Sequence, residues 1–324
     1  MSRIHKLILF CAVVPCLGFA WGFFAHKKIN RLAVFTLPPE MIGFYKRNIN
    51  YLSDEAVAPD RRRYAVEDEA PRHYIDLDEF GDSASYKLPR TWKKAVEMYG
   101  EEVLMEKGIV PWHIIRMYDR LQEAFMLSDP QKILRISAEL GHYVSDANVP
   151  LHTTSNYDGQ LTGQIGLHAF WESRLPELFF NEYDFFVGKA TYIEDVPSYA
   201  WQAVVGAHRA LDSVLLLEKE TAVRMGNQKY SFETRGKQTI KVVSPTYAKA
   251  YHQALNGMIE RKMRTSVKMT GDLWYTAWVN SGQPDLKKLI DYTPSKQELE
   301  ARKKELEEWK VHRYAARNHD SDND

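Results

Sequence analysis

The sequence predicts an all-α fold, organised as a single mainly helical domain. Long segments carry apolar residues at helical intervals, strand-like alternation is scarce, and no glycine-rich phosphate loop is present. Lys plus Arg and Asp plus Glu balance at 43 each, which excludes a global charge that would attract polyanions. We therefore expect a neutral globular protein in which any affinity for a charged ligand comes from a local site.

The first twenty residues are typical of a signal peptide. Arg3 and Lys6 precede an apolar run, 7–17, that is short for a membrane span, and small residues at its end suit a signal peptidase. A retained membrane anchor is the alternative. Cleavage before Trp21 predicts export, to the periplasm or the extracellular space, with no transmembrane anchor in the mature form. Both cysteines lie in the removed segment 1–20, so the mature chain has neither disulfides nor thiolate chemistry.

The clearest helix is predicted over residues 129–150. Asp129 is a suitable N-cap and Pro130 suits the first helical position. Apolar residues then recur at helix-like intervals, and we expect the helix to end near Pro150.

Later segments continue the helical pattern. Residues 196–221 and 245–282 read as long amphipathic helices, and 238–243 is the best, though weak, strand candidate. We expect one helical domain over 21–294. Residues 295–324 begin as a charged helix and end in a polar, acidic tail, which we expect to be solvated.

The strongest chemical pattern is the stretch GHYVSDANVPLH. His142 and Asp146 are four residues apart, so on a helix both side chains lie on one face. His152 directly follows the proline that ends the helix. The stretch GLHAFWE repeats the spacing with His168 and Glu172. A single pair of this kind is usually a surface hydrogen bond, but the repetition indicates a metal site.

Further histidines and carboxylates precede this stretch. His26 lies in WGFFAH, APDRRRY contains Asp60 and Arg63, and PRHYIDLD contains His73 and Asp76. Imidazole and carboxylate ligands without thiolate suit catalytic zinc, which leaves positions open for water and substrate. Burying so many ionisable groups together is costly unless a cation neutralises them. The pattern therefore predicts a site for several metal ions.

The ordered set W-G-x-x-x-H, PD, HYID, GHxxxDxxxPLH and HxxxE resembles the superfamily of zinc-dependent phospholipases C and single-strand-specific nucleases over residues 21 to about 175. The resemblance implies a helical phosphodiesterase domain with a trinuclear Zn²⁺ site. The ligands that it implies are Asp60, His73, His142 and Asp146 for one zinc, His152, His168 and Glu172 for a second, and Trp21 with His26 for a third, Asp146 bridging two ions.

The same resemblance implies the mechanism. Trp21 would bind through its free α-amine and carbonyl oxygen, so removal of the signal peptide would be needed to complete the third site. Zinc-bound hydroxide would attack phosphorus in a phosphoester. Asp60 would orient or deprotonate the water, and Arg63 would hold the phosphate with its bidentate fork. The alternative for Arg63 is a surface arginine in the basic run RRR.

The substrate is predicted by features that disagree. Glu172 as the last ligand and the short gap between His152 and His168 resemble a phospholipase C. They favour a phospholipid head-group phosphoester as substrate. The absence of cysteine from the mature chain also departs from the nucleases, which commonly carry disulfides. We therefore expect a phospholipase C-like hydrolase.

The spacing Asp60-x-x-Arg63 and the stretch HYID instead resemble a single-strand-specific nuclease or 3'-nucleotidase. In that arrangement Tyr74 would stack a base of single-stranded nucleic acid and Asp76 would hydrogen-bond its edge. Core packing is the alternative for Tyr74. A second alternative function is a secreted zinc-binding protein without catalysis. No stable protein partner is implied by the sequence.

Overall fold

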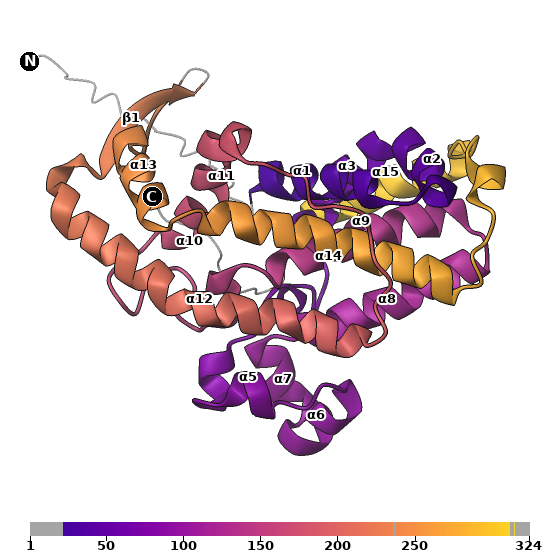
Figure 1. Cartoon of the computed structure of the whole chain (residues 1–324), viewed down its shortest axis with the longest axis horizontal. Helices are drawn as coiled ribbons and strands as arrows, with labels where there is room; N and C mark the ends of the chain where they lie inside the picture. The colour runs from indigo at the N-terminus through magenta and orange to yellow at the C-terminus, as the bar shows by residue number, and fades with distance from the viewer. Residues whose placement is uncertain (1–21, 236–237, 312–313, 315–324) are drawn as a thin grey trace, which may run out of the picture.

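The computed structural model describes residues 22–235, 238–311 and 314, and it confirms the all-α prediction (Figure 1). The predicted signal peptide and Trp21 lie outside the described residues. The α-helices are α1 (Phe23–Ala33), α2 (Pro39–Arg47), α3 (Ile49–Glu55), α4 (Ala58–Arg62), α5 (Ala84–Lys87), α6 (Trp92–Tyr99), α7 (Glu101–Lys107), α8 (Val110–Met126), α9 (Pro130–Asp146), α10 (Leu167–Ala169), α11 (Leu175–Phe179), α12 (Val196–Met225), α13 (Pro245–Ala254), α14 (Met258–Asn280) and α15 (Lys296–Val311).

Helix α9 begins as the sequence predicts. The Asp129 carboxylate accepts a hydrogen bond from the backbone N–H of Lys132 at 3.0 Å, and Pro130 occupies the first turn. The helix ends at Asp146, four residues before Pro150. The residue before a proline avoids the helical region, and Val149 is accordingly extended. A 3₁₀ turn over Pro150–Thr153 follows.

The two later helical segments differ from expectation in one respect. Helix α12 is confirmed, and it begins at the cap Asp195, whose carboxylate accepts from the Ser198 N–H at 2.9 Å. The segment 245–282 is not one helix but two, α13 and α14. The helix is interrupted at Asn256 and Gly257, which have φ values of 46° and 73°. Asn and Gly adopt this left-handed backbone conformation more readily than other residues, and it ends a helix.

The weak strand candidate is confirmed as β2 (Gln238–Val243). It pairs antiparallel with β1 (Tyr230–Arg235), Tyr230 lying opposite Val243. These two strands form the one sheet found among the described residues. The hairpin projects beside α13 at one end of the molecule (Figure 1).

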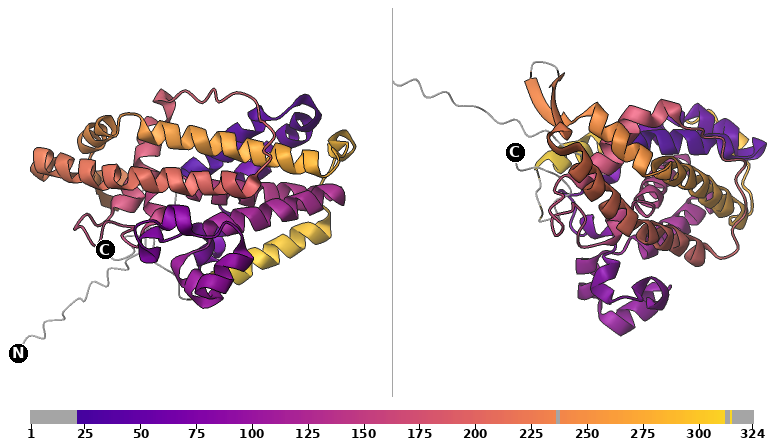
Figure 2. Two further views of the ribbon diagram at one scale, coloured as in Figure 1. Left: turned by 60° about the horizontal axis from the view of Figure 1, so that its bottom comes forward. Right: turned by 60° about the vertical axis from the view of Figure 1, so that its left-hand side comes forward.

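The long helices pack into the body of the protein. Helix α9 lies against α8, α14 lies against both, and α12 packs on α8 (Figure 2). Helix α1 packs on α3, α9 and α14, so the start of the described chain lies at the centre of the fold. The small helices α5, α6 and α7 form a separate projection below α12 (Figure 1). The metal-site candidates are carried by α1, α4, the 3₁₀ turn Ala70–His73, α9 and the segments that follow α9.

Helix α15 is the charged helix that the sequence predicts at the carboxyl end. It is attached by Trp309, a side chain only 7% exposed, which packs against Ala58 and Ala65. Most of the tail beyond it lies outside the described residues.

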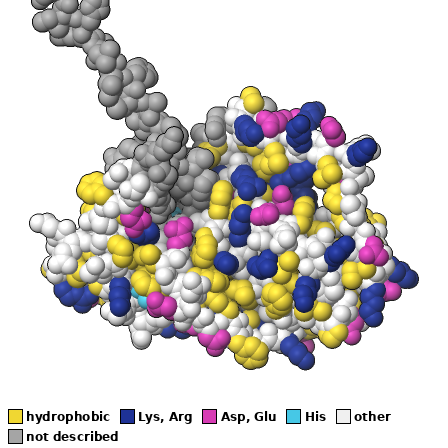
Figure 3. Space-filling view, turned by 90° about the horizontal axis from the view of Figure 1, so that it is seen from above, with side chains coloured by type: hydrophobic (Ala, Val, Ile, Leu, Met, Phe, Trp, Pro, Cys, Tyr) yellow, Lys and Arg dark blue, Asp and Glu magenta, His cyan; other side chains and the backbone are white. Residues whose placement is uncertain are grey.

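The surface agrees with the balanced composition. Figure 3 shows basic and acidic side chains intermixed on one face, with apolar side chains between them. Among the described residues, no helix combines the length and the apolar character that crossing a bilayer requires.

Candidate metal centre

The predicted metal ligands that the structure describes come together in three groups, all buried. In each group the ligand atoms lie within 4.8 Å of one another. The groups are His26, His142 and Asp146; Asp60, His73 and His142; and His152, His168 and Glu172. Trp21, predicted to complete the third site, lies outside the described residues.

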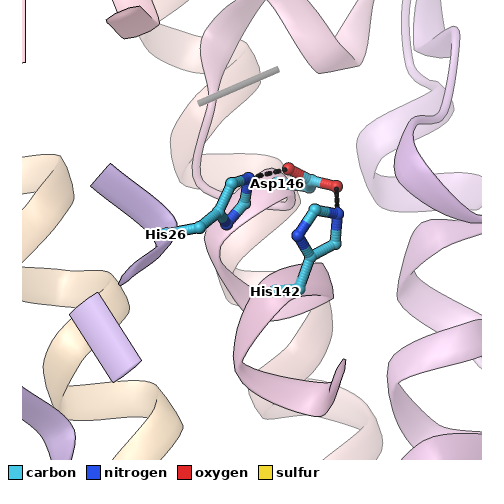
Figure 4. Close-up of side chains that lie close together, drawn as sticks. All are labelled: His26, His142 and Asp146. Atoms are coloured by element: carbon cyan, nitrogen blue, oxygen red, sulfur yellow. Dashed lines mark ion pairs between the residues drawn. The ribbon is translucent and has the colours of Figure 1, made fainter. Parts of the chain in front are cut away.

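Asp146 lies between the first two groups. Its Oδ2 is 2.9 Å from His73 Nδ1 and 3.2 Å from His142 Nε2. Its Oδ1 is 3.4 Å from His26 Nε2, on the other side of the carboxylate (Figure 4). This is the position that a carboxylate bridging two cations requires. Asp60 Oδ1 approaches the same rings, at 3.7 Å from His73 Nδ1 and 3.5 Å from His142 Nε2.

The second predicted zinc site is compact. His152 Nε2 lies 3.1 Å from His168 Nε2, and Glu172 Oε2 lies 3.3 Å and 3.1 Å from these two nitrogens. Glu172 is carried by a π-helical turn over Phe170–Arg174 that follows α10. Such turns are rare and occur mostly at functional sites, because the extra residue redirects a side chain.

Backbone carbonyls orient two of the rings. His142 Nδ1 donates to the Ala56 carbonyl at 2.8 Å, and His152 Nδ1 donates to the His73 carbonyl at 2.6 Å. These bonds fix the tautomer and leave each Nε2 as the acceptor that points into the site. The arrangement is that of metal-binding histidines.

Burial and neighbouring charges shift the pKa values of several of these histidines and carboxylates. It lowers the pKa of His73 and of His152, so both rings favour the neutral form that binds metals. Burial also raises the pKa of Asp60 well above its ordinary value. Although burial opposes it, the neighbouring His142, through its charge and its hydrogen bond, holds the pKa of Asp146 well below its usual range.

The donor set fits a cation. Both carboxylate oxygens of Asp60 and both ring nitrogens of His26 are buried without a hydrogen-bond partner among the described residues. Such groups are costly to bury unless something else satisfies them. Neutral imidazoles and carboxylates directed at common points are the ligands that zinc takes, and their spacing leaves room for ions between them.

The contacts of Gly22 explain why a glycine occupies this position. Its backbone N–H donates to Ser173 Oγ at 3.1 Å. A Cβ atom at this position would lie 2.7 Å from the same oxygen, so any larger residue would displace the contact. The first described residue is thereby held beside Glu172, close to the ligands of the second predicted site.

The residues predicted to bind substrate are buried in the structure. Arg63 is only 4% exposed, so it is not the surface arginine of the alternative interpretation. Tyr74 is 5% exposed and its hydroxyl donates to the Glu106 carbonyl at 3.3 Å. Its ring lies so close to Gly108 that a Cβ there would be 2.5 Å from Tyr74 Cδ2. This packing favours the core interpretation of Tyr74. Asp76 is also buried.

Two carboxylates near the ligands were not found from the sequence. Glu69 Oε1 lies 3.6 Å from His73 Nε2, on the edge of the ring opposite the metal groups. Glu69 and His73 are four residues apart, the spacing that singled out the other pairs, so the signal was present. Asp158 accepts hydrogen bonds from the backbone N–H groups of His168 and Gly166 at 3.2 and 3.0 Å, and no spacing pattern indicates it.

Comparison with known proteins adds a likeness in fold. No family model matches the sequence, and no curated protein matches it at a significant level. Among solved structures, the chain is similar to the alpha-toxin of Clostridium perfringens, isolated from the avian strain SWCP, with 14% sequence identity and a TM-score of 0.47. The alignment covers 83% of this chain and 65% of the alpha-toxin chain, so this chain spans less than two thirds of that protein's length.

Proposed function

We propose that this protein is an exported zinc-dependent phosphodiester hydrolase of the phospholipase C-like kind. The observation that carries the proposal is the convergence of three buried groups of histidines and carboxylates, from segments between residues 26 and 172. A protein of balanced net charge gathers these histidines and carboxylates at one place, which is typical of a multinuclear metal enzyme.

The three groups would hold three zinc ions. Asp60, His73, His142 and Asp146 would bind one, His152, His168 and Glu172 a second, and His26 with the amino end of Trp21 a third. Bound zinc supplies Lewis acidity, which activates water and stabilises charge on phosphoryl oxygens.

The remaining chemistry belongs to side chains of this chain. Asp60 is suited to accept a proton at Oδ1 or Oδ2, because no donor among the described residues binds either oxygen. Arg63 lies three residues farther on, and its guanidinium would hold two phosphate oxygens at once. Their burial excludes bulk water, which strengthens each interaction.

The substrate that we propose is the phosphoester of a phospholipid head group. The nuclease alternative would use Tyr74 to stack a base, but Tyr74 is buried and its hydroxyl is bonded to the backbone. This packing counts against base stacking there. The nuclease alternative is still supported by Asp76 and by the spacing Asp60-x-x-Arg63. A zinc-binding protein without catalysis remains the other alternative.

A substrate panel tests the proposal. Protein beginning at Trp21 would be stripped with a chelator, reloaded with zinc, and assayed with phosphatidylcholine, single-stranded DNA and an artificial phosphodiester. Zinc-dependent cleavage of phosphatidylcholine is the expected result. Cleavage of DNA alone would establish the nuclease instead, and zinc binding without turnover of any substrate would establish sequestration.

Export is part of the same proposal. The mass of the protein recovered outside the cytoplasm would show whether the chain begins at Trp21. Protein that keeps residues 1–20 would contradict both the cleavage site and the use of the Trp21 amine.

A further inference from the structure

Glu69 lies behind the metal groups, on the far edge of the His73 ring. His73 Nδ1 faces Asp146 at 2.9 Å, while Nε2 lies 3.6 Å from Glu69 Oε1. Histidines that bind metals commonly direct their second nitrogen at a carboxylate, which fixes the ring and increases its basicity. Glu69 is placed for this task.

Glu69 is itself held by three donors. Arg62 Nε lies 3.0 Å and Arg72 Nη1 2.6 Å from Glu69 Oε2, and the Tyr143 hydroxyl donates to Glu69 Oε1. These three contacts fix the position of the Glu69 carboxylate.

Arg62 continues the chain of ion pairs away from the site. Its Nη1 and Nη2 donate to the two oxygens of Glu139 at 2.8 and 3.1 Å, a bidentate pair. Arg135 Nε donates to Glu139 at 3.0 Å, and Arg135 Nη2 donates to Glu305 at 2.6 Å. Glu305 belongs to α15, so the ion pairs connect the C-terminal helix with Glu69, whose Oε1 lies 3.6 Å from His73 Nε2.

Helix α15 also packs directly on Arg62. The Trp309 ring lies 6.0 Å from Arg62 Cζ and 4.7 Å from Arg302 Cζ, and it contacts Ala58 and Ala65. Ala58 and Arg62 are the ends of α4, the helix that carries Asp60. Trp309 therefore braces the helix that carries Asp60.

The inner ion pairs of the chain are buried, but they border a cavity and not only apolar packing. Arg62, Glu69, Arg135 and Glu305 are among the side chains that line an open cavity of about 550 Å³. Buried ion pairs contribute little net stability compared with apolar packing, because desolvating the charges offsets their attraction. Four linked ion pairs beside His73 are better explained by the need to hold this metal ligand in a fixed position.

We propose that the ion-pair chain Glu305–Arg135–Glu139–Arg62–Glu69 positions the His73 imidazole for zinc, which makes α15 part of the support of the metal centre. The inference rests on the proposed metal role of His73. It assigns a function to a helix that the sequence marks only as charged.

Two substitutions test the chain at its ends. Glu69→Gln removes the charge next to His73, and Glu305→Gln breaks the connection to α15 at a partly exposed position. Lys310→Gln is the matched control, since it removes an exposed ion pair of α15 with Glu307 that has no connection to Arg62. The readouts are zinc affinity by chelator competition, the visible absorption of the cobalt-substituted protein, and the unfolding midpoint of each variant.

We expect Glu69→Gln to weaken the binding of one of the three zinc ions by about 10- to 100-fold and to change the absorption spectrum of the cobalt-substituted protein. Glu305→Gln should weaken the same ion by a smaller factor, and Lys310→Gln should leave both readouts unchanged. If Glu69→Gln fails to fold, Glu305→Gln decides. Wild-type zinc affinity and spectrum in a folded Glu305→Gln variant, or in a folded Glu69→Gln variant, overturn the inference.

The wild-type protein separates this inference from the proposed function. Three zinc ions bound by wild type and unchanged by the substitutions would reject only the positioning chain. A wild-type protein that binds no zinc would reject the metal centre and with it the positioning chain.

Discussion

His142 and Asp146 lie one turn apart on α9, with His142 Nε2 3.2 Å from Asp146 Oδ2. His73 Nδ1 reaches the same oxygen at 2.9 Å from a segment almost 70 residues earlier. Helix geometry thus fixes the pair at the centre of the site, and the other ligands are brought to it by packing. The site depends most on these two side chains.

Removal of either member of this pair should lower the zinc content of the metal centre. We expect His142→Ala and Asp146→Ala to lower turnover at least 100-fold, with bound zinc falling by one ion for His142→Ala and by more for Asp146→Ala. Asp146 has the larger effect because its Oδ1 faces His26 while its Oδ2 faces His73. Elemental analysis of the purified variants measures the zinc content.

His252→Ala is the matched control for that experiment. His252 stacks on Phe179 away from the three groups, so its removal should leave the zinc content at the wild-type value. Wild-type zinc content in His142→Ala or Asp146→Ala would contradict the assignment of ligands.

One residue added before Trp21 should cost the protein one zinc ion. The amide so formed cannot bind as a free amine does, while Gly22 and Ser173 hold the following chain in place. Native mass spectrometry of the extended and unextended proteins counts the ions. The control adds one residue after Asp324, and a full complement of zinc in the N-terminally extended protein would contradict the amine ligand.

The site could be predicted from the sequence wherever helix periodicity places the residues. The four-residue spacing of His142 and Asp146, and of His168 and Glu172, determines that each pair faces one point whatever the rest of the fold does. His26 and Asp60 required the resemblance to a known superfamily, because nothing local connects them to α9. The long helices were likewise predicted, since their periodic apolar faces are strong signals.

Other features depend on contacts that no local pattern records. The break at Asn256 and Gly257 is not one of these, because an Asn-Gly pair inside a helical pattern is a known turn signal. The bidentate pair of Arg62 and Glu139 joins residues 77 apart, so sequence spacing alone could not identify it. The burial of Tyr74 follows from its packing on Gly108, which is a tertiary contact.

Arg63→Lys should reduce turnover more than zinc content. An ammonium is a point charge and cannot present the paired donors of a guanidinium to phosphate. We therefore expect kcat to fall by about 10- to 100-fold, roughly the contribution of one hydrogen bond to a charged group, with the zinc content unchanged. The control is Arg61→Lys, an exposed neighbour in the same run. Equal rates in wild type and Arg63→Lys would exclude Arg63 from phosphate binding.

His113 should make the fold sensitive to acid. The ring is 4% exposed, lies 4.4 Å from the Tyr143 ring, and its nitrogens have no hydrogen-bond partner among the described residues. Burial, reinforced by Arg72, lowers the pKa of His113 well below its ordinary value. Below pH about 6.5 the unfolded chain takes up a proton that the folded chain refuses, so stability falls as the pH falls toward the folded pKa.

His113→Phe removes this dependence while keeping a ring of similar size. Between pH 6.5 and 5, the free energy of unfolding of the wild type should fall more steeply than that of the variant, by up to about 1.4 kcal/mol per pH unit. Urea unfolding at several pH values, with the same zinc concentration throughout, measures both slopes. Parallel slopes would mean that His113 is not held neutral by the fold.

Tyr74 separates the phospholipase from the nuclease. If Tyr74 is a core residue, Tyr74→Phe should lose only the hydrogen bond to the Glu106 carbonyl, about 0.5–1.5 kcal/mol of stability, while Tyr74→Ala should lose about 3–5 kcal/mol. Neither change should alter the KM for a soluble artificial phosphodiester in protein that is still folded. If Tyr74 stacks a base, Tyr74→Ala should instead raise the KM for single-stranded DNA by roughly 10-fold or more, since one stacked base is worth about 1–3 kcal/mol. Because Tyr74 packs on Gly108 inside the protein, we expect the first result, and the second would move the substrate from lipid to nucleic acid.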